Sequence, residues 1–161
     1  MKKLITVLAI SMFALAAPAQ AEVFSFKVFP PNTATDPGTN EGIRVTAAGT
    51  FNTVTGDILA RGSFTIVDFR GRVIDRGTWK ATEFFGFRQA AGGGPIPGEQ
   101  SGVLDMDVTL SPKGGDPIFD VPMRIVCNLP GFDTGEPAGT TVGDFTVTGG
   151  EFTQFNLHQG P

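Results

Sequence analysis

The chain has 161 residues, with twelve lysines and arginines against sixteen aspartates and glutamates, and a formal net charge of −4. This acidic balance argues against general binding of nucleic acids or anionic membranes. One histidine and one cysteine cannot build the usual zinc sites, and we expect no metal and no cofactor. Tyrosine is absent and tryptophan occurs once, which argues against a flat carbohydrate-stacking platform.

The first 21 residues have the pattern of a cleaved export signal. Lys2-Lys3 precede an apolar run from Leu4 to Ala17, and Ala19-Gln20-Ala21 is a small-x-small cleavage site. The apolar run is too short to span a bilayer, so we expect no membrane insertion. The sequence therefore predicts a bacterial protein that is periplasmic or secreted after cleavage at Ala21. Residues 22–161 are expected to form a single all-β domain.

The mature chain begins with an alternating segment. Apolar and polar residues alternate from Phe24 to Val28, which predicts a first strand. Residues 30–40 are predicted to form a loop, in which Asp36-Pro37-Gly38 favours a tight turn.

One short motif then occurs three times, as a glycine followed by a hydroxyl residue and an aromatic ring. The copies are Gly49-Thr50-Phe51, Gly62-Ser63-Phe64 and Gly77-Thr78-Trp79. They are 13 and 15 residues apart, which is too close for a helical repeat and typical of successive hairpin strands. The segment from Gly42 to Phe87 is therefore predicted to form a three-stranded antiparallel meander.

Turn signals at Thr55-Gly56-Asp57 and at Arg70-Gly71 fix the register of this meander. The two largest rings, Phe64 and Trp79, then lie opposite Gly77 and Gly62, whose missing side chains leave room for them. The other expected pairs on this apolar face are Phe51–Ile58, Gly49–Ala60, Ala47–Gly62, Val45–Phe64, Ile43–Ile66 and Ala60–Ala81. The opposite face is expected to be mostly solvated; it carries Arg44, Thr46, Ala48, Thr50, Leu59, Arg61, Ser63, Thr65, Ile74, Arg76, Thr78, Lys80 and Thr82.

Further strands follow, separated by glycine- and proline-rich loops. Residues 103–110 alternate as a fifth strand, and residues 119–129 as a sixth. Pro122 lies inside the sixth strand, which predicts an edge position or a bulge there. Its inward row is expected to be Phe119, Val121, Met123, Ile125, Cys127 and Leu129. A last hairpin is expected from residues 142–148 and 151–157, around Gly149-Gly150.

These segments predict an all-β fold. About eight antiparallel strands with short spacings are typical of a small closed or nearly closed barrel, with a two-sheet β-sandwich as the alternative. Hairpin connections and the glycine kinks of the meander favour the barrel.

Several polar residues suggest chemistry. Asp105 and Asp107 lie on one strand face, roughly 6–7 Å apart, as paired carboxylates of glycoside hydrolases can be. The favoured interpretation is a solvated outer face, with Arg124 as a surface partner. His158 and Cys127 would have to serve any nucleophilic mechanism. His158 lies near the C-terminus, and Cys127 is expected to be a small buried hydrophobe.

Loop carboxylates suggest a calcium site. The candidate pairs are Asp116 with Asp120, and Asp133 with Glu136. Neither pair follows the spacing of a calcium-binding loop, so simple surface acidity is the favoured interpretation.

Gly77-Thr78-Trp79 resembles the Gly-x-Trp motif of lipocalins, which are small exported barrels that carry apolar ligands. In lipocalins the motif lies on the first barrel strand, whereas here it falls on the fourth predicted strand. The resemblance covers these three residues and is one of architecture. It implies a barrel that could hold a small apolar ligand.

The leading functional hypothesis is an exported, non-enzymatic β-barrel domain that acts as an envelope or extracellular binding or structural protein of unknown partner. The alternative is a lipocalin-like carrier, and an enzyme of unknown type is a third hypothesis. A hollow barrel would be lined by Phe51, Phe64, Trp79, Met106 and Met123. The rings paired with glycines favour a filled interior, since an eight-stranded barrel can be either. The uneven charge, with seven basic and four acidic residues in 42–88 but two and nine in 89–161, also allows weak self-association.

Overall fold

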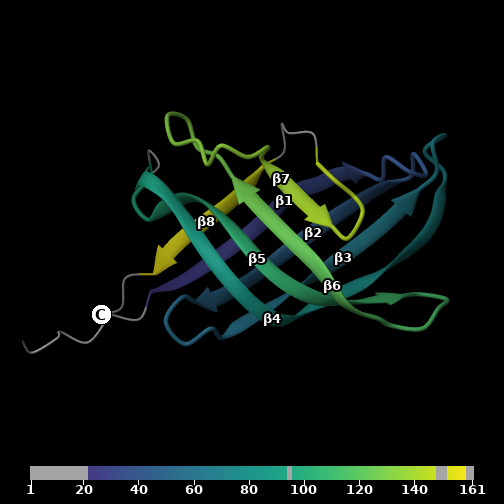
Figure 1. Ribbon diagram of the computed structural model, residues 1–161, viewed down its shortest axis with the longest axis horizontal. Coiled ribbons are helices and arrows are strands. Elements are labelled where there is room, and N and C mark those ends of the chain that lie inside the picture. Colours follow the sequence, from purple (N-terminus) through teal and green to yellow (C-terminus); the bar gives the residue numbers. More distant parts are fainter. Residues whose placement is uncertain (1–21, 94–95, 148–151, 159–161) are drawn as a thin grey trace, which may run out of the picture.

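The computed structural model describes residues 22–93, 96–147 and 152–158, and these residues form an antiparallel all-β fold (Figure 1). The predicted export signal and the Gly149-Gly150 turn lie outside the described residues. The strands are β1 (Val23–Thr35), β2 (Gly42–Asn52), β3 (Ile58–Val67), β4 (Val73–Gly93), β5 (Glu99–Pro112), β6 (Ile118–Cys127), β7 (Gly139–Val142) and β8 (Thr153–His158).

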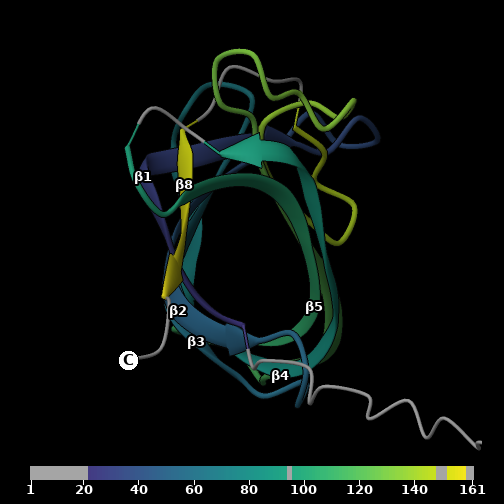
Figure 2. The same cartoon turned by 90° about the vertical axis from the view of Figure 1, so that its left-hand side faces the viewer.

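Six of the strands form a ring. Neighbours pair in the order β4-β3-β2-β1-β8-β5, and β4 pairs again with β5 to complete the circuit. Figure 2 shows this ring end-on, and β6 and β7 continue the sheet beyond β5. The sheet thus closes on itself through β4 and β5. The predicted closed or nearly closed barrel requires such closure, whereas a sandwich of two separate sheets does not.

The predicted register of the meander is confirmed. Strand β2 pairs with β3 through all five expected partners, from Phe51–Ile58 to Ile43–Ile66. Phe64 lies opposite Gly77 and Trp79 opposite Gly62 in the ladder between β3 and β4, which ends at Arg61–Lys80, one step before the expected Ala60–Ala81 pair.

The two large rings occupy the space that the facing glycines leave. A Cβ atom on Gly62 would lie 2.6 Å from Nε1 of Trp79 and 1.8 Å from the carbonyl oxygen of Thr46. A Cβ atom on Gly77 would lie 2.8 Å from the ring of Phe64. The indole N–H of Trp79 also donates a 3.0 Å hydrogen bond to the Thr46 carbonyl, which satisfies a polar group that would be costly to bury unpaired.

Strand β4 bends around the ring by means of bulges. Its pairing with β5 shifts register between Ala81 and Glu83, between Phe84 and Gly86, and again after Gln89. Each bulge resets which side chains point inward. Phe84 and Phe87 therefore pack against the core, while Phe85 is 58% exposed.

Phenylalanine rings fill one end of the ring of strands. Phe51 stacks on Phe24 with ring centroids 5.2 Å apart, and it also meets Phe84, Phe87 and Phe155 at 5.0–6.1 Å. These rings come from β1, β2, β4 and β8, so they connect the first and last strands to the meander. Such contacts contribute beyond the burial of apolar area.

The predicted loop at residues 30–40 is only partly correct. Strand β1 continues to Thr35, after a register shift between Val28 and Asn32. Asn32 is fully buried there, and its amide bridges Thr140 Oγ1, Thr153 Oγ1 and the carbonyl of Phe152 at 2.9–3.2 Å. Pro30 and Pro31 interrupt the ladder between β1 and β2 without ending the strand. The hydrogen bonds of Asn32 connect the second half of β1 to β7 and β8.

The sequence predicts an edge position or a bulge at Pro122; the structure has a bulge just before it, and the predicted inward row is wrong at its start. Val108 pairs with Val121 and Leu110 pairs with Ile118, so β6 carries one extra residue. Asp120 adopts a positive φ of 53° within this bulge. The extra residue turns Phe119 outward, where it is 67% exposed, while Met123, Ile125 and Cys127 remain buried as predicted.

The predicted last hairpin is wrong. Strand β7 spans Gly139–Val142 and pairs with β6, whereas β8 pairs with β1 and β5. Strand β8 instead fills the place between the first strand and β5, and this closes the ring. Local alternation cannot reveal this choice, because it depends on partners distant in sequence.

Candidate functional site

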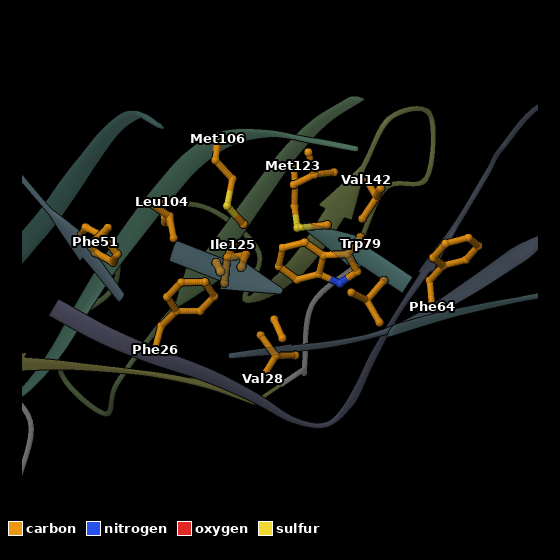
Figure 3. Packing of buried hydrophobic residues seen from close by; sticks show 14 of the residues in the cluster. Phe26, Val28, Phe51, Phe64, Trp79, Leu104, Met106, Met123, Ile125 and Val142 are labelled. Atoms are coloured by element: carbon orange, nitrogen blue, oxygen red, sulfur yellow. The ribbon is translucent and has the colours of Figure 1, made fainter. Parts of the chain in front are cut away.

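The five residues predicted to line a hollow barrel all lie in one buried cluster. Phe51, Phe64, Trp79, Met106 and Met123 each expose 2% or less of their surface. Figure 3 shows Met106 and Met123 pointing toward Trp79 from one wall, with Phe26 and Val28 on the opposite side. A side chain that lines an open cavity keeps part of its surface free of neighbouring atoms. The burial of these five residues is instead that of a packed core.

The outer side of β1–β4 carries a row of cations, which belongs to a surface that we call the basic face. Lys27 pairs with Ala48, Ala48 with Arg61, and Arg61 with Lys80. Because paired residues lie side by side and point to the same side of a sheet, these side chains form one row across four strands. The predicted solvated face is confirmed, since all thirteen of its residues are exposed except Thr46 and Thr65, which are half-buried.

A row of hydroxyl groups lies next to the row of cations. Thr46 pairs with Ser63, Ser63 with Thr78, and Thr78 with Ser111, so β2 to β5 each contribute one hydroxyl. Two of these groups form a hydrogen bond, since Thr46 Oγ1 and Ser63 Oγ are 2.8 Å apart.

A second cationic row follows on the far side of the hydroxyl row. Arg44 pairs with Thr65, and Thr65 pairs with Arg76. The basic face is therefore defined by five cations, Lys27, Arg44, Arg61, Arg76 and Lys80, which frame the hydroxyl row.

Two adjoining open hollows of about 790 and 740 Å³ lie on the basic face. Lys27, Ala48, Arg61 and Lys80 line both of them. The first is otherwise polar through the hydroxyl row, and the second through Ser25, Thr50, Gln154 and Asn156. None of the described residues that line either hollow is acidic.

The cations of the basic face are not neutralised by neighbouring side chains. Within the described part of the chain, the ion pairs involve Arg72, Arg88 and Arg124, and none of the five cations of the basic face. Lys27 is exposed and lies over the ring of Phe29, with Nζ 4.8 Å from the ring centroid. The hollows therefore combine open space with uncompensated positive charge.

The wall formed by β4, β5 and β6 differs from the basic face because its charged residues form ion pairs. We call Arg88, Asp105, Arg124 and Glu136 the paired cluster; Glu136 lies between β6 and β7. Arg124 donates to Asp105 at 2.6 Å and to Glu136 at 3.1 Å, and Glu136 also pairs with Arg88. The hydrogen bond to Asp105 is the main cause that raises the pKa of the Arg124 guanidinium. A smaller hollow of about 340 Å³ lies beside this cluster, and Asp105, Arg124 and Glu136 are among its lining residues.

The favoured interpretation of Asp105 and Asp107 is borne out for Asp105, because Arg124 across the hairpin is its surface partner. Asp107 lies opposite Glu83 on β4 and Pro122 on β6. The two aspartates thus have different surroundings on the outer wall.

Cys127 is buried, as predicted, and its thiol donates to the carbonyl oxygen of Thr153 at 2.8 Å. Burial raises its pKa to about 11, so the reactive thiolate is scarce at neutral pH. His158 pairs with Val23 in the ladder between β8 and β1. Its Nε2 lies 2.8 Å from Ser25 Oγ on the exposed surface.

The two candidate calcium pairs have separate surroundings. Asp116 and Asp120 are exposed at the start of β6, and Glu136 is held by two arginines in the paired cluster. Among the described residues, no three His, Cys, Asp or Glu side chains are grouped so that they could hold a metal ion.

No protein-family model, curated protein or solved structure matches this chain. Among the residues that the structure describes, no helix is long and apolar enough to cross a membrane. The packed interior and the charge pattern of the outer walls are therefore the features that bear on function.

Proposed function

We propose that this protein is an exported, non-enzymatic binding protein that holds an anionic partner on its basic face. One observation carries the proposal: Lys27, Arg61 and Lys80 stand in one row and line both hollows without an acidic neighbour among the lining residues. Like charges on neighbouring strands repel each other and destabilise a sheet. A bound anion would remove that repulsion and occupy the open space.

The interior supports this use of the surface. Phe51, Phe64 and Trp79 are packed against neighbouring side chains, so the volume inside the ring is used for stability. The carrier of a small apolar ligand remains the second proposal, and it would require this core to open. The packing favours the surface-binding protein over the carrier.

Export is part of the proposal, because the Lys2-Lys3 start, the apolar run and the Ala19-Gln20-Ala21 site have the pattern of a cleaved export signal. N-terminal sequencing of the native protein should find Glu22 as its first residue, in a periplasmic or culture fraction. A native start at Met1 in the cytoplasm would contradict this part.

Binding can be tested with dextran sulfate as a generic polyanion, by titration at several salt concentrations. Arg61→Gln and Lys80→Gln should each weaken binding at least threefold and reduce its dependence on salt, because each removes one charge from the row. Arg70→Gln is the matched control, since it makes the same change of net charge in the turn between β3 and β4, outside both hollows. Equal losses in all three variants, or no salt-dependent binding, would overturn the proposal.

A further inference from the structure

We propose that the anionic partner is an acidic polysaccharide that lies across the strands of the basic face, an inference that rests on the proposed function. The basic face alternates in chemistry from row to row: a cationic row, a hydroxyl row and a second cationic row. A polysaccharide with carboxylate or sulfate groups also carries free hydroxyls, so a chain that lies across the strands can place its charged groups over the cationic row and its hydroxyls over the neighbouring hydroxyl row. The surface and this class of polymer thus match in both kinds of group.

The spacing of the rows suits an extended chain. Neighbouring strands are about 4.8 Å apart, and residues two apart on a strand are separated by about 6.7 Å. Lys27, Arg61 and Lys80 therefore present a cation on β1, β3 and β4 along one line across the sheet. Thr46, Ser63, Thr78 and Ser111 offer hydrogen-bonding hydroxyls one row away on β2 to β5.

The extent of the hollows favours a polymer over a single small anion. The two hollows share the cationic row and together involve strands from β8, through β1 to β4, to β5. On the other side of the cationic row, Ser25, Thr50 and Asn156 line the second hollow, and Gln154 of β8 continues the row beyond Lys27. Hydroxyl and amide groups therefore flank the three cations on both sides, and both can bind sugar hydroxyls.

Other anionic polymers match the basic face less well. Proteins that bind single-stranded nucleic acids stack the bases on aromatic side chains. Phe29 is the one described aromatic that is exposed in these hollows, and Lys27 lies over its ring. A second copy of this chain is another possible partner, since its wall with the paired cluster carries carboxylates. It would, however, offer no regular set of hydroxyls to the hydroxyl row.

The test compares three polyanions at one salt concentration by isothermal titration of the purified protein. The probes are polygalacturonate, polyglutamate and single-stranded polythymidylate, with matched chain lengths. We expect polygalacturonate to bind at least tenfold more tightly than the other two. Equal binding of all three would overturn the polysaccharide inference and leave the anion-binding proposal standing, whereas a complete lack of binding would overturn both.

The hydroxyl row provides a second, independent readout. Thr78→Val and Ser111→Ala should together weaken binding of polygalacturonate about three- to tenfold and leave the affinity for polyglutamate unchanged. Thr82→Val, outside both hollows, is the control and should change neither. An equal loss of affinity for both polymers would show that these hydroxyls do not bind sugar hydroxyls, and it would overturn the inference.

Analytical ultracentrifugation tests whether a second copy of this chain binds to the basic face. The polysaccharide inference predicts a monomer at low salt in the absence of polymer. A concentration-dependent dimer that Arg61→Gln abolishes would identify a second copy as the partner, and it would overturn the inference.

Discussion

The inner and outer sides of β2, β3 and β4 differ in how tightly the structure specifies each residue. On the inner side, Trp79 and Phe64 fill space that Gly62 and Gly77 leave, and a Cβ atom at either glycine would overlap its neighbours. On the outer side, one residue away along each strand, Arg61 and Lys80 are exposed and make no ion pair within the described part of the chain.

This difference separates stability from binding within one set of strands. The inner side chains have neighbours on every side, so their chemistry is used within the protein. The cations of the basic face have no acidic neighbours in the hollows that three of them line, so their charge remains available to a partner. Substitutions on the two sides should therefore affect different measurements.

The largest effect is expected for Trp79→Ala. Removal of a fully packed ring should lower the free energy of unfolding by about 3–5 kcal/mol, and the hydrogen bond to the Thr46 carbonyl is lost with it. Denaturant unfolding followed by circular dichroism measures this change. A loss below about 1 kcal/mol would mean that the ring is not packed.

Gly62→Ala should be the next largest. The added methyl group would overlap the Thr46 carbonyl and the indole, so we expect a loss of about 1–3 kcal/mol through overpacking. Gly86→Ala in β4 is the matched control, because its added methyl group meets no atom within 4 Å and should change stability little. The same loss at both sites would contradict the packing of Trp79 against Gly62.

Cys127 gives a smaller effect that depends on pH. Its pKa is raised by burial from 9.0 to about 11, so the thiol ionises first in the unfolded chain. The folded state should therefore lose stability as pH rises from about 9 to 11, and Cys127→Ala should lack this loss. The native protein should also react slowly with a thiol reagent and quickly when unfolded. Fast labelling of the folded protein would place Cys127 outside the core.

The smallest change in stability is expected on the basic face. Arg61→Gln should shift the free energy of unfolding by less than about 0.5 kcal/mol, while it weakens binding of polyanions, because the side chain is exposed and forms no ion pair with the residues that the structure describes. Equilibrium unfolding of this variant checks the separation. A loss as large as that of Gly62→Ala would show that the outer side is also part of the packing.

The meander could be predicted from the sequence because its signals are local. Gly56 and Gly71 both adopt positive φ in the turns that set the register, and the glycine-to-ring pairs follow from that register. The arrangement of β8 could not be predicted in this way. Its alternation is equally compatible with the predicted hairpin on residues 142–148, and contacts with Phe26 and Asn32 on distant β1 decide the outcome.

Part of the candidate site can also be predicted from the sequence. The predicted register already places Arg61 beside Lys80 on the solvated face, but Lys27 joins the row only through the pairing of β1 with β2. Phe119 shows a different limit, because the alternation around it was clear and a bulge at Asp120 reversed it. Charge rows and bulges are properties of paired strands, so a single strand pattern does not determine them.

The interior is a packed core, and we propose that binding occurs outside it. Trp79 is the only tryptophan and the chain has no tyrosine, so its fluorescence reports on the interior alone. We expect blue-shifted emission that does not change when a fatty acid or another apolar probe is added. Saturable quenching or a shift of that emission by an apolar probe would contradict a packed interior and make the protein a carrier.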